Sequence, residues 1–424
     1  MYLRTLHLQQ FRNYQDQTVE FMAPKTILLG NNAQGKSNLL EAVELLATLK
    51  SHRAARDREL ILEGAKASRI TARLERDHSP LELVINFHLG SRRSMAINQQ
   101  SMKRHLDFLG SLNAVQFSSL DLELVRGTPE KRRNWLDTIL MQIEPIYAHI
   151  LHQYNQVLRQ RNALLKTLQS HRFTKHNIPS SGESLGLLNS PDTDNADNSN
   201  DFADSNNLSN LSNFSNLNNL NNSPNSFREE LALWDAQLAT TGSRVTRRRA
   251  RALERLAPLA QDWHTKISGR TETFTLNYLP NVAIPEDNPE KVQEAFLEKI
   301  QLRRIPEQQQ GTSLVGSHRD DIEFLINQTP AKFYGSQGQQ RTLVLALKLA
   351  ELKLIEEVVG EAPLLLLDDV LAELDLHRQN QLLEAIQDRF QTLITTTHLG
   401  SFDTDWLRNS QILSVESGMV LDKF

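Results

Sequence analysis

The sequence predicts an α/β fold in which short aliphatic strands alternate with helices around a largely parallel sheet. Three segments show this pattern: 26–29 precedes a helix from Ser37, 364–367 precedes another helix, and 392–396 lies near the end. That alternation indicates a layered α/β core. A small antiparallel meander is expected to flank the core sheet, formed by residues 69–75, 81–88 and 94–98.

Length and composition fit a protein of two or more units, one of which can be split in sequence. The chain has 424 residues, of which 23% are charged and 39% hydrophobic, enough for a sizeable core. It contains no apolar run of about 20 residues and no apolar stretch of a signal peptide, so we expect a cytoplasmic protein without membrane contact. With no cysteine, disulfides and thiolate metal sites are excluded. The net charge of −4 means that nucleic-acid contacts would depend on local basic patches.

Two long helical patterns occupy the middle of the chain. Apolar residues recur at three- and four-residue spacing in 144–167 and 227–263, which predicts the paired helices of an arm. The segment 176–226 between them is rich in Asn, Ser and Asp and buries too little apolar surface to fold, so we expect a disordered insertion. The predicted domains are a head of residues 1–127 and 311–424 and an arm of residues 128–310.

The strongest single motif is GNNAQGKS, which lies between a predicted strand and a predicted helix. It matches the phosphate-binding loop, and this strand and helix are the context that the motif requires. Two glycines let the backbone wrap phosphates, to which amide groups and the helix N-terminus add positive potential. Lys36 is expected to reach the β- and γ-phosphates of ATP, and the Ser37 hydroxyl to bind Mg²⁺. The predicted ATP-binding residues are Gly30, Asn31, Asn32, Ala33, Gln34, Gly35, Lys36 and Ser37.

A second motif, PLLLLDD, places two carboxylates at the end of a leucine-rich segment. The leucines predict a buried strand whose acidic end can face a metal ion. Asp368 is the expected Mg²⁺ partner, directly or through water. Asp369 could polarise the attacking water as a general base. Together with the phosphate loop, these acids indicate ATP hydrolysis.

The third motif, FYGSQGQQR, precedes a long helix with apolar periodicity. Ser336, Gln337 and Gly338 are expected at its N-terminus, where a hydroxyl and free N–H groups can bind an anion. The motif lies some thirty residues before the two carboxylates, as in the signature of ABC-type ATPases. Because that signature binds the γ-phosphate held by the opposite protomer, a pair of molecules would complete the site.

Two later positions fit the same scheme. Asp375 follows the acidic strand, in the place of the D-loop that crosses the dimer seam. His398 ends the strand QTLITTT, in the place of the switch histidine that senses γ-phosphate. A single histidine at a strand end is also compatible with a structural role.

Seven segments are similar in sequence to one bacterial family: LHLQQFRNYQ, GNNAQGKSN, SHRAARDRELI, AVQFSSLDLELVRGTPEKRRNWLD, GSHRDDIEF, YGSQGQQR and LLLLDDVLAELD. They closely resemble the RecF family of DNA replication and repair proteins. The resemblance covers nearly all of the chain outside the Asn/Ser-rich insertion. Residues 113–137 and 333–375 are its most specific parts.

The resemblance implies a split ABC/SMC-like ATPase head with a flanking antiparallel sheet and an inserted helical arm. It implies an ATP-dependent homodimer on DNA gaps and single-strand/double-strand junctions, weak hydrolysis for release, and RecR and RecO as partners. By the same resemblance, Arg12 and Asn13 contact nucleotide and Gln116 contacts the metal. Ala33 and Ser317 depart from the family pattern, where glycine and proline are common, and Ala33 suits the loop if its φ is negative.

DNA contacts are predicted only as groups of basic residues. One group follows the first helix, one lies in the meander and one is the run RVTRRRAR on a helix. A basic run is also typical of a solvated helix face. If DNA is bound, phosphate contacts should dominate and sequence preference should be weak. The candidates are His52, Arg53, Arg56 and Arg58 in the first group, Arg92 and Arg93 in the meander, and Arg247 and Arg248 in the run.

Three other functions are compatible with the nucleotide motifs. A transporter cassette would need a much shorter stretch between the phosphate loop and the signature. A nuclease with an SMC-like head would need a catalytic domain after His398, and few residues follow it. A DNA-bound scaffold that uses ATP only as a switch remains open.

Overall fold

The computed structural model describes residues 1–76, 79–176, 224–269, 272–386, 389–400, 402 and 404–422. Contacts divide the chain into two compact units: Met1–Tyr147, Arg249–Leu279 and Asp321–Phe424 form the first, and Ala148–Arg248 with Pro280–Asp320 forms the second. Most of the predicted insertion, residues 177–223, lies outside the described residues.

A six-stranded sheet forms the centre of the first unit, and the parallel sheet that the sequence predicts is confirmed. Its strand order is β15-β14-β3-β13-β12-β8, and only β15 is antiparallel to its neighbour. The central strands are almost fully buried, as expected of a parallel sheet covered on both faces. The strands are β3 (Lys25–Leu29), β8 (Ala114–Ser118), β12 (Leu364–Asp368), β13 (Thr392–Thr396), β14 (Ser410–Glu416) and β15 (Met419–Asp422).

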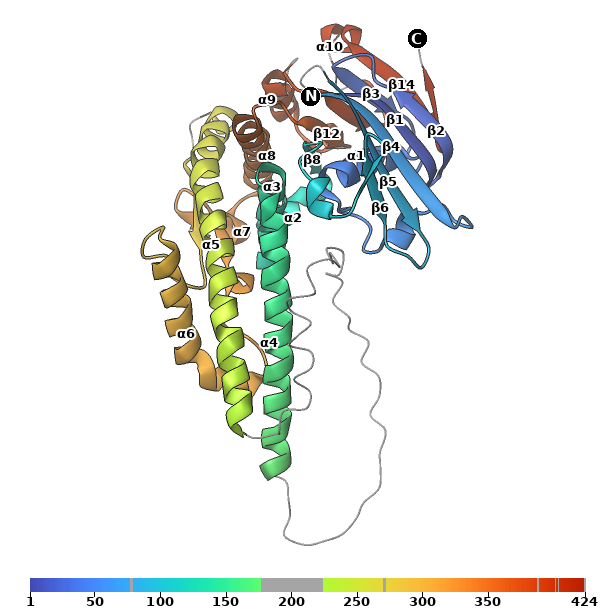
Figure 1. Cartoon of the computed structure of the whole chain (residues 1–424). Coiled ribbons are helices and arrows are strands. Elements are labelled where there is room, and N and C mark those ends of the chain that lie inside the picture. The colour runs from blue at the N-terminus through green and yellow to red at the C-terminus, as the bar shows by residue number, and fades with distance from the viewer. Residues whose placement is uncertain are drawn as a thin grey trace. The chain divides into compact units, whose positions relative to one another are not determined.

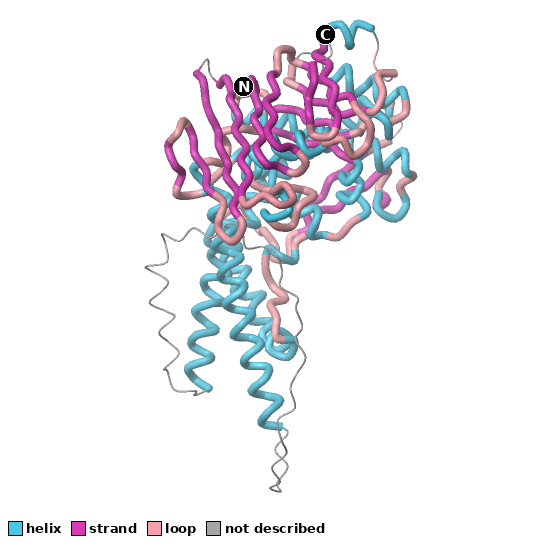
Figure 2. Tube along the Cα trace, turned by 90° about the vertical axis from the view of Figure 1, so that its right-hand side faces the viewer, coloured by secondary structure: helices cyan, strands magenta, loops and turns pink. Residues whose placement is uncertain are grey.

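The predicted meander is part of a larger antiparallel sheet with the order β2-β1-β4-β5-β6-β7. Its strands lie side by side in Figure 2. β4 alternates buried and exposed side chains, which fits a sheet with one face on the core. The meander prediction is therefore confirmed for β4, β5 and β6, but it lacked β1, β2 and β7. The strands are β1 (Tyr2–Phe11), β2 (Tyr14–Glu20), β4 (Ala67–Arg76), β5 (Ser79–His88), β6 (Ser94–Ile97) and β7 (Gln100–Met102).

Helix α1 (Lys36–Thr48) lies between these two sheets (Figure 1). It contacts β8, β12 and β13 on one side and β5 on the other. Ten of its 13 residues are buried, and seven of these are apolar, as expected of a helix inside a core. This position anchors the loop that precedes α1 to both sheets.

The remaining elements of the first unit surround the core. A three-stranded sheet has the order β11-β10-β9, and helix α8 (Gln337–Val359) contacts β8 and α3. The other helices and strands are α2 (Glu123–Arg126), α3 (Pro129–Ile143), β9 (Phe274–Leu279), β10 (Asp321–Ile326), β11 (Thr329–Pro330), α7 (Ala331–Tyr334), α9 (Leu376–Ile386) and α10 (Thr404–Arg408). Short 3₁₀ turns span Asp57–Leu60, His105–Asp107, Ser119–Leu122, Ser317–Arg319 and Leu371–Glu373.

The second unit is helical, built from most of α4 (Ile146–His176), the first part of α5 (Pro224–Ser268), and α6 (Pro289–Gln310). Helices are therefore confirmed at 144–167 and 227–263, and both are longer than predicted. Inside this unit the fully buried Arg161 bonds Asp235 at 2.8 Å, Glu307 at 2.6 Å and Ser313 at 2.7 Å.

The observed division differs from the predicted arm of residues 128–310. Helix α3 falls in the first unit because it packs on α1, α8 and β10. The end of α5 and strand β9 also belong there, since β9 pairs with β10. No helix in the described part of the chain is long and apolar enough to cross a membrane.

Candidate nucleotide site at the edge of the parallel sheet

The loop from Gly30 to Ser37 joins β3 to α1, and two of its glycines are required by geometry. A Cβ on Gly30 would lie 2.3 Å from the backbone oxygen of Val415. Gly35 has a φ of +116°, and a Cβ there would lie 2.7 Å from the Asn13 side chain. The loop therefore passes too close to its neighbours for any residue with a side chain at these two positions.

Ala33 was expected to suit the loop only if its φ is negative, and this condition is not met. Its φ is +64°, in the left-handed region where a Cβ crowds the following carbonyl. The exposed residue thus holds a strained backbone at the tip of the loop. We attribute the strain to the tight return of the chain toward Gly35. Glycine would fit position 33 better than alanine does.

Lys36 and two residues of the antiparallel sheet hold the loop in shape. The buried Lys36 ammonium donates to the carbonyl oxygens of Gly30 at 2.9 Å and Asn31 at 3.0 Å. The Asn13 amide donates to the Gln34 carbonyl at 2.9 Å, and the Tyr14 hydroxyl donates to the Gly35 carbonyl at 2.9 Å. Asn31 and Asn32 are exposed at the loop surface.

The two motifs that are farthest apart in sequence meet at one carboxylate. The Ser37 hydroxyl donates to Asp368 Oδ1 at 2.7 Å. Thr395, on β13, donates to the same oxygen at 2.9 Å and accepts the N–H of Asp369 at 2.8 Å. Asp369 has a φ of +53°, a conformation that Asp tolerates better than most residues. Thr395, which was not singled out from the sequence, therefore holds the carboxylate of Asp368 and the backbone of Asp369.

Gln116 presents a buried oxygen near this cluster. It lies on β8, level with Leu366 of the acidic strand, and its Nε2 lies 3.3 Å from His52 Nε2. Its Oε1 is buried and has no hydrogen-bond partner among the described residues. A buried oxygen of this kind is open to a partner such as an ordered water molecule or a metal ion.

His52 links this amide to an acid on α1. Its Nδ1 lies 2.6 Å from Glu44 Oε2. Burial lowers the pKa of His52, but the hydrogen bond to Glu44 and the nearby carboxylates outweigh burial and raise that pKa above its usual value. From the sequence, His52 was predicted only as a candidate DNA contact, so its contact with Gln116 was missed.

Arg12 has partners within the protein. Its guanidinium bonds both oxygens of the fully buried Glu41, at 2.9 Å and 2.6 Å, and donates to the Glu59 carbonyl at 2.8 Å. Asn13, the next residue, contacts the loop backbone and the Asn38 amide. A nucleotide contact by Arg12 stays a prediction.

His398 lies just beyond the end of β13, next to the phosphate-loop strand. The Gly30 N–H donates to the Thr396 carbonyl at 3.2 Å, which ties the end of β13 to the start of the loop. The His398 Nδ1 lies 3.1 Å from the Thr397 hydroxyl, and the residue is exposed. The carboxyl ends of β3, β13 and β12 thus bring the loop, His398 and Asp368 to one edge, where α/β sheets bind ligands.

The signature segment starts α8, as predicted. Ser336 is the N-cap, and it forms a capping box with Gln339: the Ser336 N–H donates to Gln339 Oε1 at 2.7 Å, and the Gln339 N–H donates to Ser336 Oγ at 3.2 Å. Gly338 lies against Arg378, whose Nη2 would be 3.2 Å from a Cβ at that position. Arg378 also pairs with Asp375.

Two exposed aromatic residues precede the signature. Phe333 and Tyr334 are each 74% exposed, and Leu376, which follows Asp375, is 73% exposed. The phenyl and phenol rings form an edge-to-face pair with centroids 6.5 Å apart. Large apolar side chains this exposed mark a candidate interaction surface.

The basic candidates differ in their exposure and in the partners that they contact. Arg53, Arg56 and Arg92 are exposed. Arg93 is buried, bonded to the Leu49 carbonyl at 2.6 Å and paired with Asp57 at 3.1 Å, so its charge is committed inside the protein and the prediction of a DNA contact there is wrong. In the second unit Arg247 bonds Asp287 at 2.7 Å, and Arg248 is half-buried.

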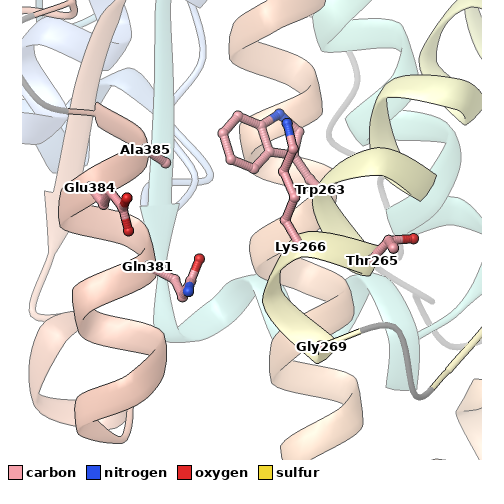
Figure 3. Close-up of a pocket in the computed structure, with 7 residues that line it drawn as sticks. All are labelled: Trp263, Thr265, Lys266, Gly269, Gln381, Glu384 and Ala385. Carbon is pink, nitrogen blue, oxygen red and sulfur yellow. The ribbon is translucent and has the colours of Figure 1, made fainter.

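One hollow lined by described residues lies away from this site. It has a volume of about 650 Å³ and lies between the end of α5 and α9 (Figure 3). Trp263, Lys266, Gln381 and Glu384 line it, and it contains none of the predicted nucleotide residues. We therefore place no nucleotide there.

Comparisons with known proteins point to one family. The family model described as RecF/RecN/SMC N terminal domain matches residues 2–419. A DNA replication and repair protein RecF from Gloeothece citriformis is 61% identical over 422 residues, covering 100% of both chains, and one from Nostoc punctiforme is 60% identical, covering 99% of each. Among solved structures, the recombination mediator protein RecF-ATPrS in the RecFOR pathway has a TM-score of 0.81 at 27% identity, covering 100% of this chain and 98% of that one.

Proposed function

The chain belongs to the RecF family of DNA replication and repair proteins, and on that basis we propose that it binds ATP, acts on DNA in repair and serves as a recombination mediator. Relatives of this name align with it from end to end, and a similar structure carries ATP in its name. A transporter cassette does not fit a chain that belongs to the RecF family.

The contact between Ser37 and Asp368 is the observation that carries the ATP site. It joins a loop shaped for phosphates to a carboxylate 331 residues later in the chain. In a phosphate-loop ATPase these two groups bind the same Mg²⁺. The loop from Gly30 to Ser37, with Lys36 at the β- and γ-phosphates, is the proposed nucleotide cradle.

Mg²⁺ fits the oxygens that are gathered here. Ser37 Oγ, Asp368 Oδ1 and the orphaned Gln116 Oε1 are the hard donors that Mg²⁺ prefers, and phosphate oxygens would complete the set. No group of three His, Cys, Asp or Glu in the described residues is arranged to bind a metal on its own, so the site depends on the nucleotide. When bound, the ion would neutralise charge on the phosphates.

Asp369 is the proposed general base for a slow hydrolysis that DNA stimulates. Thr395 holds its backbone N–H, so the carboxylate is carried by a fixed turn at the end of β12. His398 lies at the end of the neighbouring strand and is proposed to sense the γ-phosphate. A slow reaction fits a role in which hydrolysis of ATP sets the time at which the protein is released from DNA, rather than one in which it drives work.

The composite site is the second part of the proposal. Ser336, Gln337 and Gly338 are engaged with the start of their own helix, where the free N–H groups of α8 can bind an anion. We propose that this anion is the γ-phosphate of a second copy, with Asp375 beside the seam. Two molecules would then close on two ATP molecules.

DNA, RecR and RecO are the proposed partners of this dimer. The exposed Arg53, Arg56 and Arg92 are the remaining candidates in the first unit, and Arg247 and Arg248 in the second would act only if their present contacts exchange. Such residues would bind phosphates, so affinity should fall steeply with salt and depend little on sequence. Gapped or junction DNA is the proposed substrate.

Two substitutions test the proposal because they separate ATP binding from assembly. Asp369→Asn removes the base but keeps a residue that tolerates positive φ, so we expect an ATP-bound dimer that accumulates on gapped DNA. Ser336→Arg places bulk and positive charge on the surface that meets the partner, so we expect normal ATP binding by a monomer with little hydrolysis. Light scattering and nucleotide binding on the same samples measure both.

Ser336→Asp is the matched control because aspartate caps a helix as well as serine does. It should fold normally yet repel a phosphate, and so fail to dimerise. A Ser336→Arg protein that still dimerises with ATP would refute the composite site, and one that no longer binds ATP would place Ser336 in its own protomer's site. Turnover that is absent with and without DNA would favour the scaffold that uses ATP only as a switch.

A further inference from the structure

A glutamate outside every predicted motif holds the signature segment. Glu272 lies between α5 and β9, and its Oε1 accepts a hydrogen bond from Gln339 Nε2 at 2.8 Å. Gln339 is the capping-box partner of Ser336. The Gln339 amide therefore uses its oxygen on the Ser336 N–H and its nitrogen on Glu272.

Glu272 lies beside a buried aromatic cluster. Its Oε2 lies 3.6 Å from Nε2 of His264, a fully buried residue of α5. The imidazole lies 5.3 Å from the Phe274 ring, centroid to centroid, and that ring lies 6.4 Å from Phe324. The carboxylate thus extends from a packed aromatic cluster toward the signature.

The next residue is held from the other side. Gln340 is buried, accepts a hydrogen bond from Arg126 at 2.7 Å and donates to the Ala331 carbonyl at 2.9 Å. The first turn of α8 is consequently tied at two adjacent residues by groups from three other segments. Such ties fix the direction of the free N–H groups at the helix start.

We propose that Glu272 is a positioning residue for the signature half-site, and that it acts through Gln339 to orient Ser336 toward the γ-phosphate of a second copy. The inference rests on the proposed function, whose composite site it deepens. A helix terminus that is already oriented binds an anion without first losing rotational freedom. Loss of the carboxylate leaves the capping box intact but allows it to turn.

Four variants test this with a non-hydrolysable ATP analogue and Mg²⁺, with the dissociation constant of the dimer measured by sedimentation. Glu272→Ala should weaken dimerisation about tenfold, the size of one charge-assisted hydrogen bond. Glu272→Gln retains an acceptor oxygen and should stay close to wild type. Gln339→Glu keeps the capping box, in which glutamate is equally suitable, but sets two carboxylates against each other and should weaken dimerisation at least as much.

The fourth variant carries Glu272→Gln and Gln339→Glu together. It restores a hydrogen bond with donor and acceptor exchanged, so dimerisation should recover relative to Gln339→Glu alone. A defect that came only from a loosened fold or a damaged helix cap would not be rescued by a second change at the partner position. Nucleotide binding by the monomer should be unchanged in all four proteins.

The outcomes distinguish a failure of the composite site from a failure of the positioning role of Glu272. Wild-type protein that stays monomeric with the analogue would refute the composite site and this inference with it. Wild-type protein that dimerises, with Glu272→Ala equally able to do so or with no recovery in the exchanged pair, would refute the positioning role alone. If Glu272→Ala does not fold, the comparison of Gln339→Glu with the exchanged pair still tests the positioning role of Glu272.

Discussion

Replacing Arg12 with alanine tests whether this residue serves the fold or the nucleotide. The change removes two hydrogen bonds to Glu41, at 2.9 Å and 2.6 Å, and one to the Glu59 carbonyl. Glu41 is fully buried. Of the side-chain hydrogen bonds described here, it would keep only the one from the Ser51 hydroxyl, at 2.5 Å. Breaking a buried ion pair by removing one partner destabilises by about 3–5 kcal/mol because an uncompensated charge remains.

We expect the lower end of that range for Arg12→Ala, about 3 kcal/mol, because the Ser51 hydroxyl still solvates the carboxylate and Arg12 itself is one-fifth exposed. Urea titration at neutral pH measures the loss. In the same background Glu41→Gln removes the buried charge and should recover about 2 kcal/mol, a coupling of the size that contacting residues show.

The rival explanation predicts the opposite pattern. If Arg12 acts mainly on nucleotide, Arg12→Ala should unfold at the wild-type urea concentration and bind ATP much more weakly. A wild-type unfolding midpoint, or a double variant no more stable than Arg12→Ala, would refute the structural argument. ATP affinity is therefore measured on both proteins under conditions where each is folded.

Three further predictions concern the loop and the buried histidine. Lys36→Ala removes the ammonium meant for the β- and γ-phosphates, so hydrolysis should be lost and ATP binding weakened; wild-type turnover would contradict the phosphate-loop assignment. Ala33→Gly should raise the free energy of unfolding by about 0.5–1 kcal/mol, since relief of left-handed strain exceeds the entropy that glycine adds to the unfolded chain; a destabilised variant would contradict this. Burial lowers the pKa of His264, against the opposing charge of Glu272, so the unfolded chain binds the extra proton and stability falls as pH drops below about 6.5. His264→Gln should lose that slope, up to about 1.4 kcal/mol per pH unit, in urea titrations at several pH values.

Local signals were sufficient for the parts of the site that depend on short stretches of chain. Gly30 and Gly35 were predictable because a phosphate loop needs glycine at sites of close approach, and both sites are close. The leucine run before Asp368 was predictable as a buried strand because aliphatic residues without polar alternation fit only a covered sheet. The capping motif at Ser336 likewise follows from residues three positions apart.

Conformation within the loop was not predictable from the same signals. Ala33 was expected to be harmless at negative φ, yet its φ is +64°. Arg93 was grouped with surface cations, yet it is buried against Asp57. Partners that are distant in sequence determine the burial of Arg93, and the return of the loop toward Gly35 determines the φ of Ala33. A composition or spacing pattern records neither of them.

The sequence by itself determined which residues we propose for the chemistry: a phosphate loop, two acids that end a buried strand, and a serine-glycine helix start. Tertiary structure alone decided what orients them. Thr395 reaches Asp368 across neighbouring strands, Arg12 is committed to Glu41, and Glu272 holds Gln339 from 67 residues away. The physical reason is that a motif consists of particular residue types at short spacing, because the chemistry requires them there. A hydrogen bond between distant segments can be made by many residue types, and it exists only once the chain has folded.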